Sequence, residues 1–496
     1  MMSGEHRLVV VAPIDGESSC GISPHSDMEL QALDFQGQDA PPTESNGFTL
    51  LPAASLSDSS RGSGGDDGDD VMDGGLGFRK EASGTAGVSI DPEGQHLSSD
   101  VRTFLNLLIS FIGAGILGIP YAFRQGGLLM SSVVITLVGV LCMYCMWMLV
   151  RCKYRVMAMR NKDLGLVTYA DVCHEALGNT GLLAVESALV ASQAGFSTAY
   201  LLFIARNLNA LFETSKAPVI LMCMPGLVIM CLIKHLKYLA PFSLIAEVVN
   251  LTGLAIVFFD DAEFMDISHE SIDQARWKAL PFVFGVGVYC FEGMGMVLPV
   301  EAAMINRDKF TSILALVMFI YTGLCVLSGA LGYLAFGDET QDIILLNIGS
   351  SASTLVVKLS FCVGVYFTFP IMMVPVWEVL ELKWLRSQSS SYARSRNMLR
   401  MGVVLSTGLL AYAVPNFGLF VSLIGSSCCA LLAFILPTLC YGRLERSAGY
   451  PLRMWQSLLN GMILWCGVFA MVSGTFDTLH RIVLEFTKSS GDGGER

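Results

Sequence analysis

Two glutamates lie inside apolar stretches of this chain, where a charged side chain is costly. Glu292 lies within Ala279–Pro299, and Glu247 lies within Pro241–Asn250. Ionisable residues at membrane depth usually mark an ion or proton pathway. No histidine falls within an apolar segment, so carboxyl groups remain as the proton carriers. We expect Glu292 and Glu247 to provide proton coupling. The alternative is structural, with each carboxylate accepting hydrogen bonds from nearby backbone.

Other polar residues of the apolar segments have weaker claims to function. Thr368 offers one hydroxyl oxygen for a sodium ion, and a single hydroxyl does not define a sodium site. Glu186 and Lys358 lie nearer to segment ends and can reach an interface. Glu301 follows Pro299 at the end of its segment, where we expect it to be solvated.

Two apolar segments carry glycines near their middle and a proline shortly after. The first has Gly113 and Gly115 before its proline, and the second has Gly293 and Gly295. Gly costs about 1 kcal/mol and Pro about 3 kcal/mol relative to Ala inside a helix. Backbone groups freed in hydrocarbon find no water. We therefore expect two broken helices that face a ligand, although glycines also permit close helix packing.

A broken membrane helix has a specific binding chemistry. Free N–H groups at a half-helix N-terminus favour a carboxylate, and unwound carbonyls favour an ammonium group. Together they match a zwitterion, so we expect an amino acid at the two breaks. The aromatic residues of the predicted site can instead be ordinary packing. The predicted substrate-binding residues are Ile112, Gly113, Ala114, Gly115, Ile116, Phe196, Tyr200, Tyr289, Phe291, Gly293 and Gly295.

The composition is that of a membrane protein. The chain has 496 residues, of which 53% are hydrophobic and only 15% are charged. Its acidity belongs to the first 100 residues, which hold 18 acidic and 4 basic residues, so no basic footprint for nucleic acid is present. The 14 cysteines show no metal-ligand spacing, and we expect no cofactor.

Apolar segments run near 101–124, 128–150, 181–212, 218–233, 238–259, 279–300, 311–336, 352–377, 398–416, 418–440 and 455–476.

The connecting loops predict an orientation. Lys and Arg gather after the even-numbered segments, whereas acidic residues gather in the loops near 260–273 and 338–342. This bias places the N-terminus in the cytosol. The two broken segments lie five apart, so the halves 101–260 and 277–440 enter the membrane from opposite sides, as in an inverted-repeat transporter.

The rest of the chain is assigned by composition. Residues 1–98 are rich in Gly, Ser and Asp and predict a disordered cytosolic tail with possible cytosolic partners. Residues 99–476 form the predicted transporter domain, with 455–476 as an extra helix. Residues 477–496 are predicted to be a C-terminal tail.

Seven stretches carry a likeness to a known family: 111–123, 200–204, 241–250, 290–301, 332–337, 369–375 and 414–418. Together they resemble the amino acid/auxin permease family, closest to its vacuolar and proton-coupled amino acid transporter branches. The resemblance implies an all-α membrane protein with 11 transmembrane helices in a leucine-transporter-type fold (a 5+5 inverted repeat plus one helix). It also implies a vacuolar, lysosomal or plasma membrane location. Asn106 stands where some proton-coupled members have His, and this difference favours the vacuolar branch.

We therefore expect a secondary active transporter of small neutral amino acids that works by alternating access, with protons as the coupling ion. Sodium coupling is an alternative, and so is an amino acid sensor that signals through its N-terminal tail. A channel is disfavoured because no filter motif is present. An enzyme is disfavoured because the apolar core holds no metal or nucleophile constellation.

Overall fold

The computed structural model describes residues 98–160, 167–233, 253, 272–348, 352–385, 392–450 and 452–492. Helices dominate these residues, as the apolar segments predict. A helix satisfies its own backbone hydrogen bonds, which hydrocarbon requires. The helices are α1 (Asp100–Phe111), η1 (Ala114–Gly118), α2 (Ile119–Gly126), α3 (Leu128–Arg160), α4 (Tyr169–Phe212), α5 (Lys216–Leu232), η3 (Trp277–Ala279), α7 (Leu280–Cys290), α8 (Met294–Ala302), η4 (Arg307–Lys309), α9 (Phe310–Phe336), η5 (Gly337–Glu339), η6 (Ile344–Leu346), α10 (Ala352–Met372), α11 (Val374–Trp384), α12 (Tyr392–Ala413), α13 (Phe417–Ile424), η7 (Gly425–Cys429), η8 (Leu431–Ile435), α14 (Leu436–Ser447) and α15 (Met454–Asp492).

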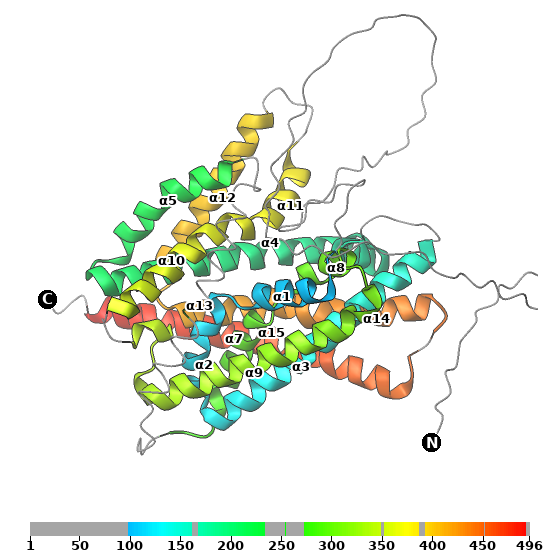
Figure 1. Ribbon diagram of the computed structural model, residues 1–496, viewed down its shortest axis with the longest axis horizontal. Coiled ribbons are helices and arrows are strands. Elements are labelled where there is room, and N and C mark those ends of the chain that lie inside the picture. Colours follow the sequence, from blue (N-terminus) through cyan, green and yellow to red (C-terminus); the bar gives the residue numbers. More distant parts are fainter. Residues whose placement is uncertain are drawn as a thin grey trace, which may run out of the picture. The chain divides into compact units, whose positions relative to one another are not determined.

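The helices pack in two groups (Figure 1). In the first group, α4 contacts α5, α10, α11 and α12. In the second, α3 contacts α7, α8 and α9, and α2 contacts α7 and α9. The interrupted helix from α13 to α14 touches both groups, because α13 contacts α4 as well as α7. The broken segments thus belong to one group and face α4 of the other.

Several helices extend beyond the apolar segments that predicted them. The helix α4 begins at Tyr169 rather than near 181, because Thr168 and Asp171 form a capping box. Gly178, with φ 68° and ψ −153°, then bends the helix. The helix α15 continues through Asp492, into the residues predicted to be a C-terminal tail. An ion pair from Arg481 to Asp477, one turn apart, supports that polar extension.

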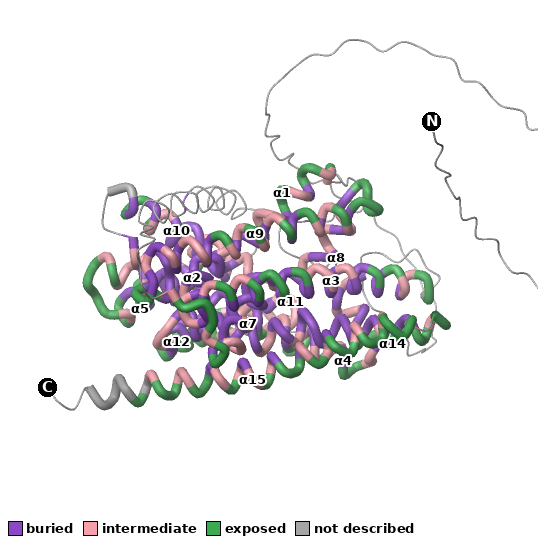
Figure 2. The backbone as a smooth tube through the Cα atoms, turned by 90° about the horizontal axis from the view of Figure 1, so that it is seen from below, coloured by how far each residue is buried: buried purple, intermediate pink, exposed green. Residues whose placement is uncertain are grey.

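Among the residues that the structure describes, seven helical stretches are long and apolar enough to cross a membrane, and the bent pair Asp100–Phe111 and Ala114–Gly126 makes an eighth. The shorter apolar helix α5 adds to these. Buried residues gather in the middle of the helix packing, whereas α15 exposes one flank along its length (Figure 2). The segment predicted at 238–259, and with it Glu247, lies outside the described residues except for Gly253.

Candidate functional site

The first predicted break is present. The helix α1 ends at Phe111, and Gly113 takes an extended conformation with φ −114° and ψ −175°. The short helix η1 starts at Ala114, and the axis bends by 41° across the break. The first N–H groups of any helix have no partner within it. Those of Ala114 and Gly115 donate to none of the residues that the structure describes.

The second predicted break is present too. The helix α7 ends at Cys290, and α8 begins at Met294 after Gly293. The Tyr321 hydroxyl of α9 donates to the Cys290 carbonyl oxygen at 3.1 Å. Tyr321 therefore satisfies one of the carbonyls that the end of α7 leaves free. The sequence reasoning missed this residue, because a single tyrosine in an apolar helix carries no signal of its partner.

The two breaks meet in space. A Cβ atom added to Gly115 would lie 3.0 Å from Cε1 of Tyr289 and 3.2 Å from the Cys290 sulfur. A Cβ atom added to Gly293 would lie 2.6 Å from the Phe111 ring. The glycines thus let each break approach the end of the other broken helix. The close-packing alternative therefore holds here, since packing brings the two unwound backbones together. A ligand at the breaks stays a prediction.

The predicted aromatic walls divide into two sets. Phe196 of α4 packs edge-to-face on Tyr289 at 4.8 Å between ring centroids. The Tyr200 hydroxyl, one turn further along α4, lies 3.7 Å from where a Cβ of Gly113 would be. Phe291 instead turns its fully buried ring toward Tyr321, at 5.3 Å between centroids. The buried residues Ile112 and Ile116 complete the first break.

Glu292 lies in the second break, between Phe291 and Gly293. Its Oε1 atom is buried and has no hydrogen-bond partner among the described residues. The backbone N–H of Met294 faces the same carboxylate. A buried carboxylate oxygen without a partner is unusual, because its burial is costly unless something satisfies it. By contrast, the Thr368 hydroxyl of α10 donates to the Gly364 carbonyl oxygen at 2.9 Å, within its own helix.

The three charged residues near segment ends, Glu186, Glu301 and Lys358, have partners among the described residues. The expectation that Glu301 is solvated is wrong, because its side chain is 0% exposed and forms an ion pair with Lys153. The Tyr154 hydroxyl also donates to it. This pair joins the end of α8 to α3, and burial of an ion pair requires such additional hydrogen bonds. Glu186 forms an ion pair with Lys383. The Lys358 ammonium donates to the Ile348 carbonyl oxygen at 3.0 Å.

A polar network lies at the end of the molecule where α2 and α4 finish. Asp342 is 2% exposed and lies in the loop after α9. Its Oδ1 accepts from Arg206 of α4 at 2.6 Å, and its Oδ2 accepts from the Phe417 N–H at the start of α13 at 2.8 Å. Arg124 of α2 donates to the Thr340 carbonyl oxygen at 2.9 Å. This loop therefore ties the two helix groups together.

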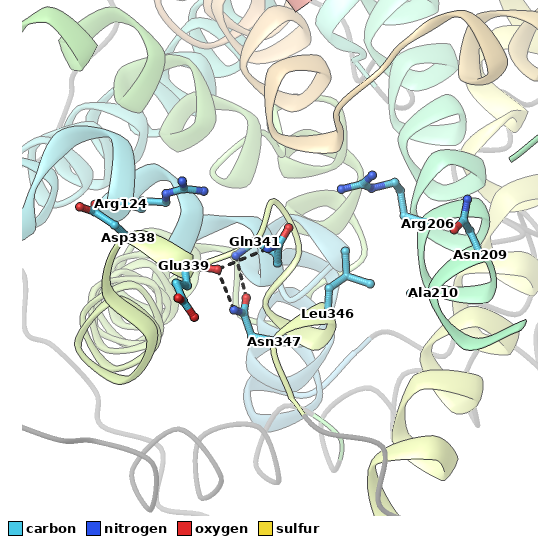
Figure 3. Close-up of a pocket in the computed structure, with 9 residues that line it drawn as sticks. All are labelled: Arg124, Arg206, Asn209, Ala210, Asp338, Glu339, Gln341, Leu346 and Asn347. Atoms are coloured by element: carbon cyan, nitrogen blue, oxygen red, sulfur yellow. Dashed lines mark hydrogen bonds between the residues drawn. The ribbon is translucent and has the colours of Figure 1, made fainter. Parts of the chain in front are cut away.

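A cavity of about 560 Å³ opens beside this network (Figure 3). The sequence reasoning did not foresee it, because its residues come from separate segments. The acidic loop near 338–342 was the one visible signal. Its lining consists of Arg124, Arg206, Asn209, Ala210, Asp338, Glu339, Gln341, Leu346 and Asn347.

Comparison with known proteins gives consistent matches. Residues 96–479 match the model of a family described as transmembrane amino acid transporter protein. The amino acid transporter ANT1 of Arabidopsis thaliana is 35% identical over 403 residues, covering 77% of this chain and 92% of that protein. The vacuolar amino acid transporter 4 of Saccharomyces cerevisiae is 27% identical, covering 79% of this chain and 60% of that protein. The proton-coupled amino acid transporter-like protein pathetic of Drosophila melanogaster is 27% identical, covering 82% of this chain and 91% of that protein.

A solved structure gives an independent match to the fold. The inward-facing conformation of Mhp1 superposes with a TM-score of 0.53, covering 80% of this chain and 94% of that one. The sequences are 11% identical, so this likeness concerns the fold alone.

Proposed function

Because the chain belongs to the transmembrane amino acid transporter family, we propose that it moves small neutral amino acids across a membrane by alternating access, coupled to protons. The observation that carries this proposal is the meeting of two broken helices, with free N–H groups at Ala114 and Gly115. A transporter site at the bilayer midplane is built from such discontinuous helices.

The substrate chemistry follows from the two unwound backbones. The N–H groups at the start of η1 face an α-carboxylate, as the positive end of a helix dipole favours. The carbonyls at the ends of α1 and α7 face the α-ammonium group. Phe196, Tyr200 and Tyr289 enclose the side chain of the amino acid. The close approach of Tyr289 to Gly115 leaves little room and favours small side chains.

Proton coupling falls to Glu292. Its unpartnered Oε1 lies one residue from Gly293, so a change in its protonation alters the hydrogen bonding of the break itself. A protonated carboxyl group gains a donor that can bond a free carbonyl, and an ionised one can accept from the α-ammonium group. Glu247 is a second candidate. Sodium coupling through Thr368 is less well supported, because its hydroxyl already bonds within α10.

The proposed architecture is a leucine-transporter-type fold with 11 transmembrane helices, in which 101–260 and 277–440 are inverted repeats. The breaks at Gly113 and Gly293 occupy matching places in these two halves. The proposed orientation places the N-terminus in the cytosol and the Asp342 network on the opposite side. Relatives described as vacuolar favour a vacuolar or lysosomal membrane, with the plasma membrane as the alternative.

Alternating access requires one side of the site to close while the other opens. Asp342, in the loop after α9, bonds both Arg206 of α4 and the Phe417 N–H at the start of α13. Arg124 of α2 bonds the Thr340 carbonyl oxygen of the same loop. Opening on the non-cytosolic side must therefore break these contacts. We propose that this network closes the non-cytosolic side in the state described.

The test is flux through the purified full-length chain in proteoliposomes, measured for each radiolabelled neutral L-amino acid with and without an imposed pH gradient. We expect uptake of small neutral amino acids that accumulates with the gradient. Uptake that requires sodium and ignores pH would replace protons as the coupling ion. Binding without flux for every amino acid would contradict transport and favour a sensor.

A further inference from the structure

The polar cavity between α2 and α4 has the features of a binding site in its own right. Figure 3 shows that Arg124 and Arg206 project from opposite sides toward the same space. Each guanidinium group has five N–H donors. Arg124 gives one hydrogen bond to Thr340, and Arg206 gives one to Asp342. The Nε atom of Arg206 is buried and has no hydrogen-bond partner among the described residues.

The third wall of the cavity is the loop after α9, which is held by hydrogen bonds within itself. Asn347 donates to the Glu339 carbonyl oxygen at 2.9 Å and accepts from the Gln341 N–H at 2.7 Å. The Thr340 hydroxyl donates to the Gly337 carbonyl oxygen at 2.7 Å. These bonds hold the loop in place before any ligand binds, and such preorganisation favours affinity. These hydrogen bonds therefore give this wall of the cavity a defined shape.

The charges of the cavity are mixed. Two guanidinium groups face it from α2 and α4, and Asp338 and Glu339 are among the residues that line it from the loop. Asp338 is paired with Arg276, and Asp342 with Arg206. A simple anion would meet the acidic loop, and a simple cation would meet the two arginines. A zwitterion with a carboxylate at one end and an ammonium at the other matches both.

We propose that this cavity is a second amino acid-binding site, separate from the breaks and on the non-cytosolic side. Arg124 and Arg206 hold the α-carboxylate, and Glu339 faces the α-ammonium group. The class of ligand, an amino acid, rests on the proposed function. The location of the site does not. Asp342 bonds the lining residue Arg206, and its carbonyl oxygen lies 3.7 Å from where a Cβ of Gly118 would be. Gly118 is three residues from Gly115, which is roughly 6 Å along a 3-10 helix at about 2 Å per residue.

The cavity therefore lies next to the first break, and a substrate that enters or leaves on this side passes through it. In this proposal the hydrogen bond from the Phe417 N–H to Asp342 lies between the two sites. Two amino acids can then bind to one chain at the same time.

The experiment is equilibrium binding of radiolabelled L-alanine, L-leucine and L-tyrosine, each assayed singly, to the purified full-length chain in nanodiscs. We expect two molecules bound per chain for at least one of them. Arg124→Gln removes a carboxylate ligand, and Asn209→Leu fills the cavity while leaving both arginines. Each should reduce the stoichiometry to one. Arg102→Gln, an exposed arginine of α1, is the control and should keep two.

The site at the breaks is removed separately by Gly113→Val. This variant should also leave one molecule bound, now at the cavity. A single bound molecule in the unmodified chain that Gly113→Val abolishes would overturn the cavity proposal and leave the proposed function standing. A single bound molecule that only Arg124→Gln and Asn209→Leu abolish would overturn the proposed function and leave the cavity proposal standing. Propionate and ethylamine serve as competitors. Displacement by propionate as effective as by unlabelled L-alanine would overturn the zwitterion assignment.

Discussion

Gly113→Ala should separate substrate binding from folding. The new methyl group would have only the Tyr200 hydroxyl nearby, at 3.7 Å, which is ordinary van der Waals contact. The backbone there is extended with φ −114°, which alanine adopts without strain. A compatible Gly→Ala change stabilises a protein by about 0.4–1 kcal/mol through its unfolded state. Thermal unfolding in detergent should therefore show an unchanged or slightly more stable protein.

The same methyl group occupies space that the substrate needs. Forcing an extra methyl group into a filled site costs about 1–3 kcal/mol. With tenfold in affinity for each 1.4 kcal/mol, the KM for amino acid uptake should rise by roughly 5- to 140-fold. The assay is initial-rate uptake into proteoliposomes. The control is Gly323→Ala in α9, where a Cβ meets nothing within 4 Å and transport should not change. An unchanged KM in Gly113→Ala would refute the placement of the substrate at the first break.

Three further changes test other parts of the structure. Glu292→Gln should abolish accumulation driven by a pH gradient while exchange of amino acid at constant pH persists, and accumulation at the unmodified level would remove Glu292 from coupling. Glu301→Ala should lower the free energy of unfolding by about 3–5 kcal/mol because it strands the buried Lys153 ammonium, whereas the double variant Lys153→Met/Glu301→Leu should recover it; equal losses in both would contradict this. Gly425→Ala should prevent correct folding, measured by the yield of monodisperse protein, because the new Cβ would lie 1.9 Å from the Gly285 carbonyl oxygen. Normal yield of that variant would show that α7 and η7 can separate.

The sequence was sufficient to place both breaks, because a helix fault in hydrocarbon has a strong local signature. Gly113 and Gly293 interrupt their helices where the glycine and proline spacing indicated. Hydrophobicity also located the helices among the residues that the structure describes. It did not locate their ends, because ends depend on caps such as Thr168 with Asp171 and on ion pairs such as Arg481 with Asp477.

Contacts between segments that are distant in the chain could not be predicted from the sequence. Glu301 looks solvated from its position after Pro299, and only the fold reveals that Lys153 lies against it, 148 residues earlier. The same holds for Arg206 and Asp342, which are 136 residues apart. Phe291 shows a related limit: its position beside the break was correct, but the direction of its ring depends on the packing of Tyr321.

The most direct measurement is an experimental structure of the protein with a bound neutral amino acid, solved at a resolution that shows the ligand. We expect the α-carboxylate to lie within about 3 Å of the N–H groups of Ala114 and Gly115, as a hydrogen bond requires. The α-ammonium group should face the carbonyl ends of α1 and α7. A continuous helix through 112–116, or a ligand whose carboxylate contacts neither N–H group, would contradict the proposed site.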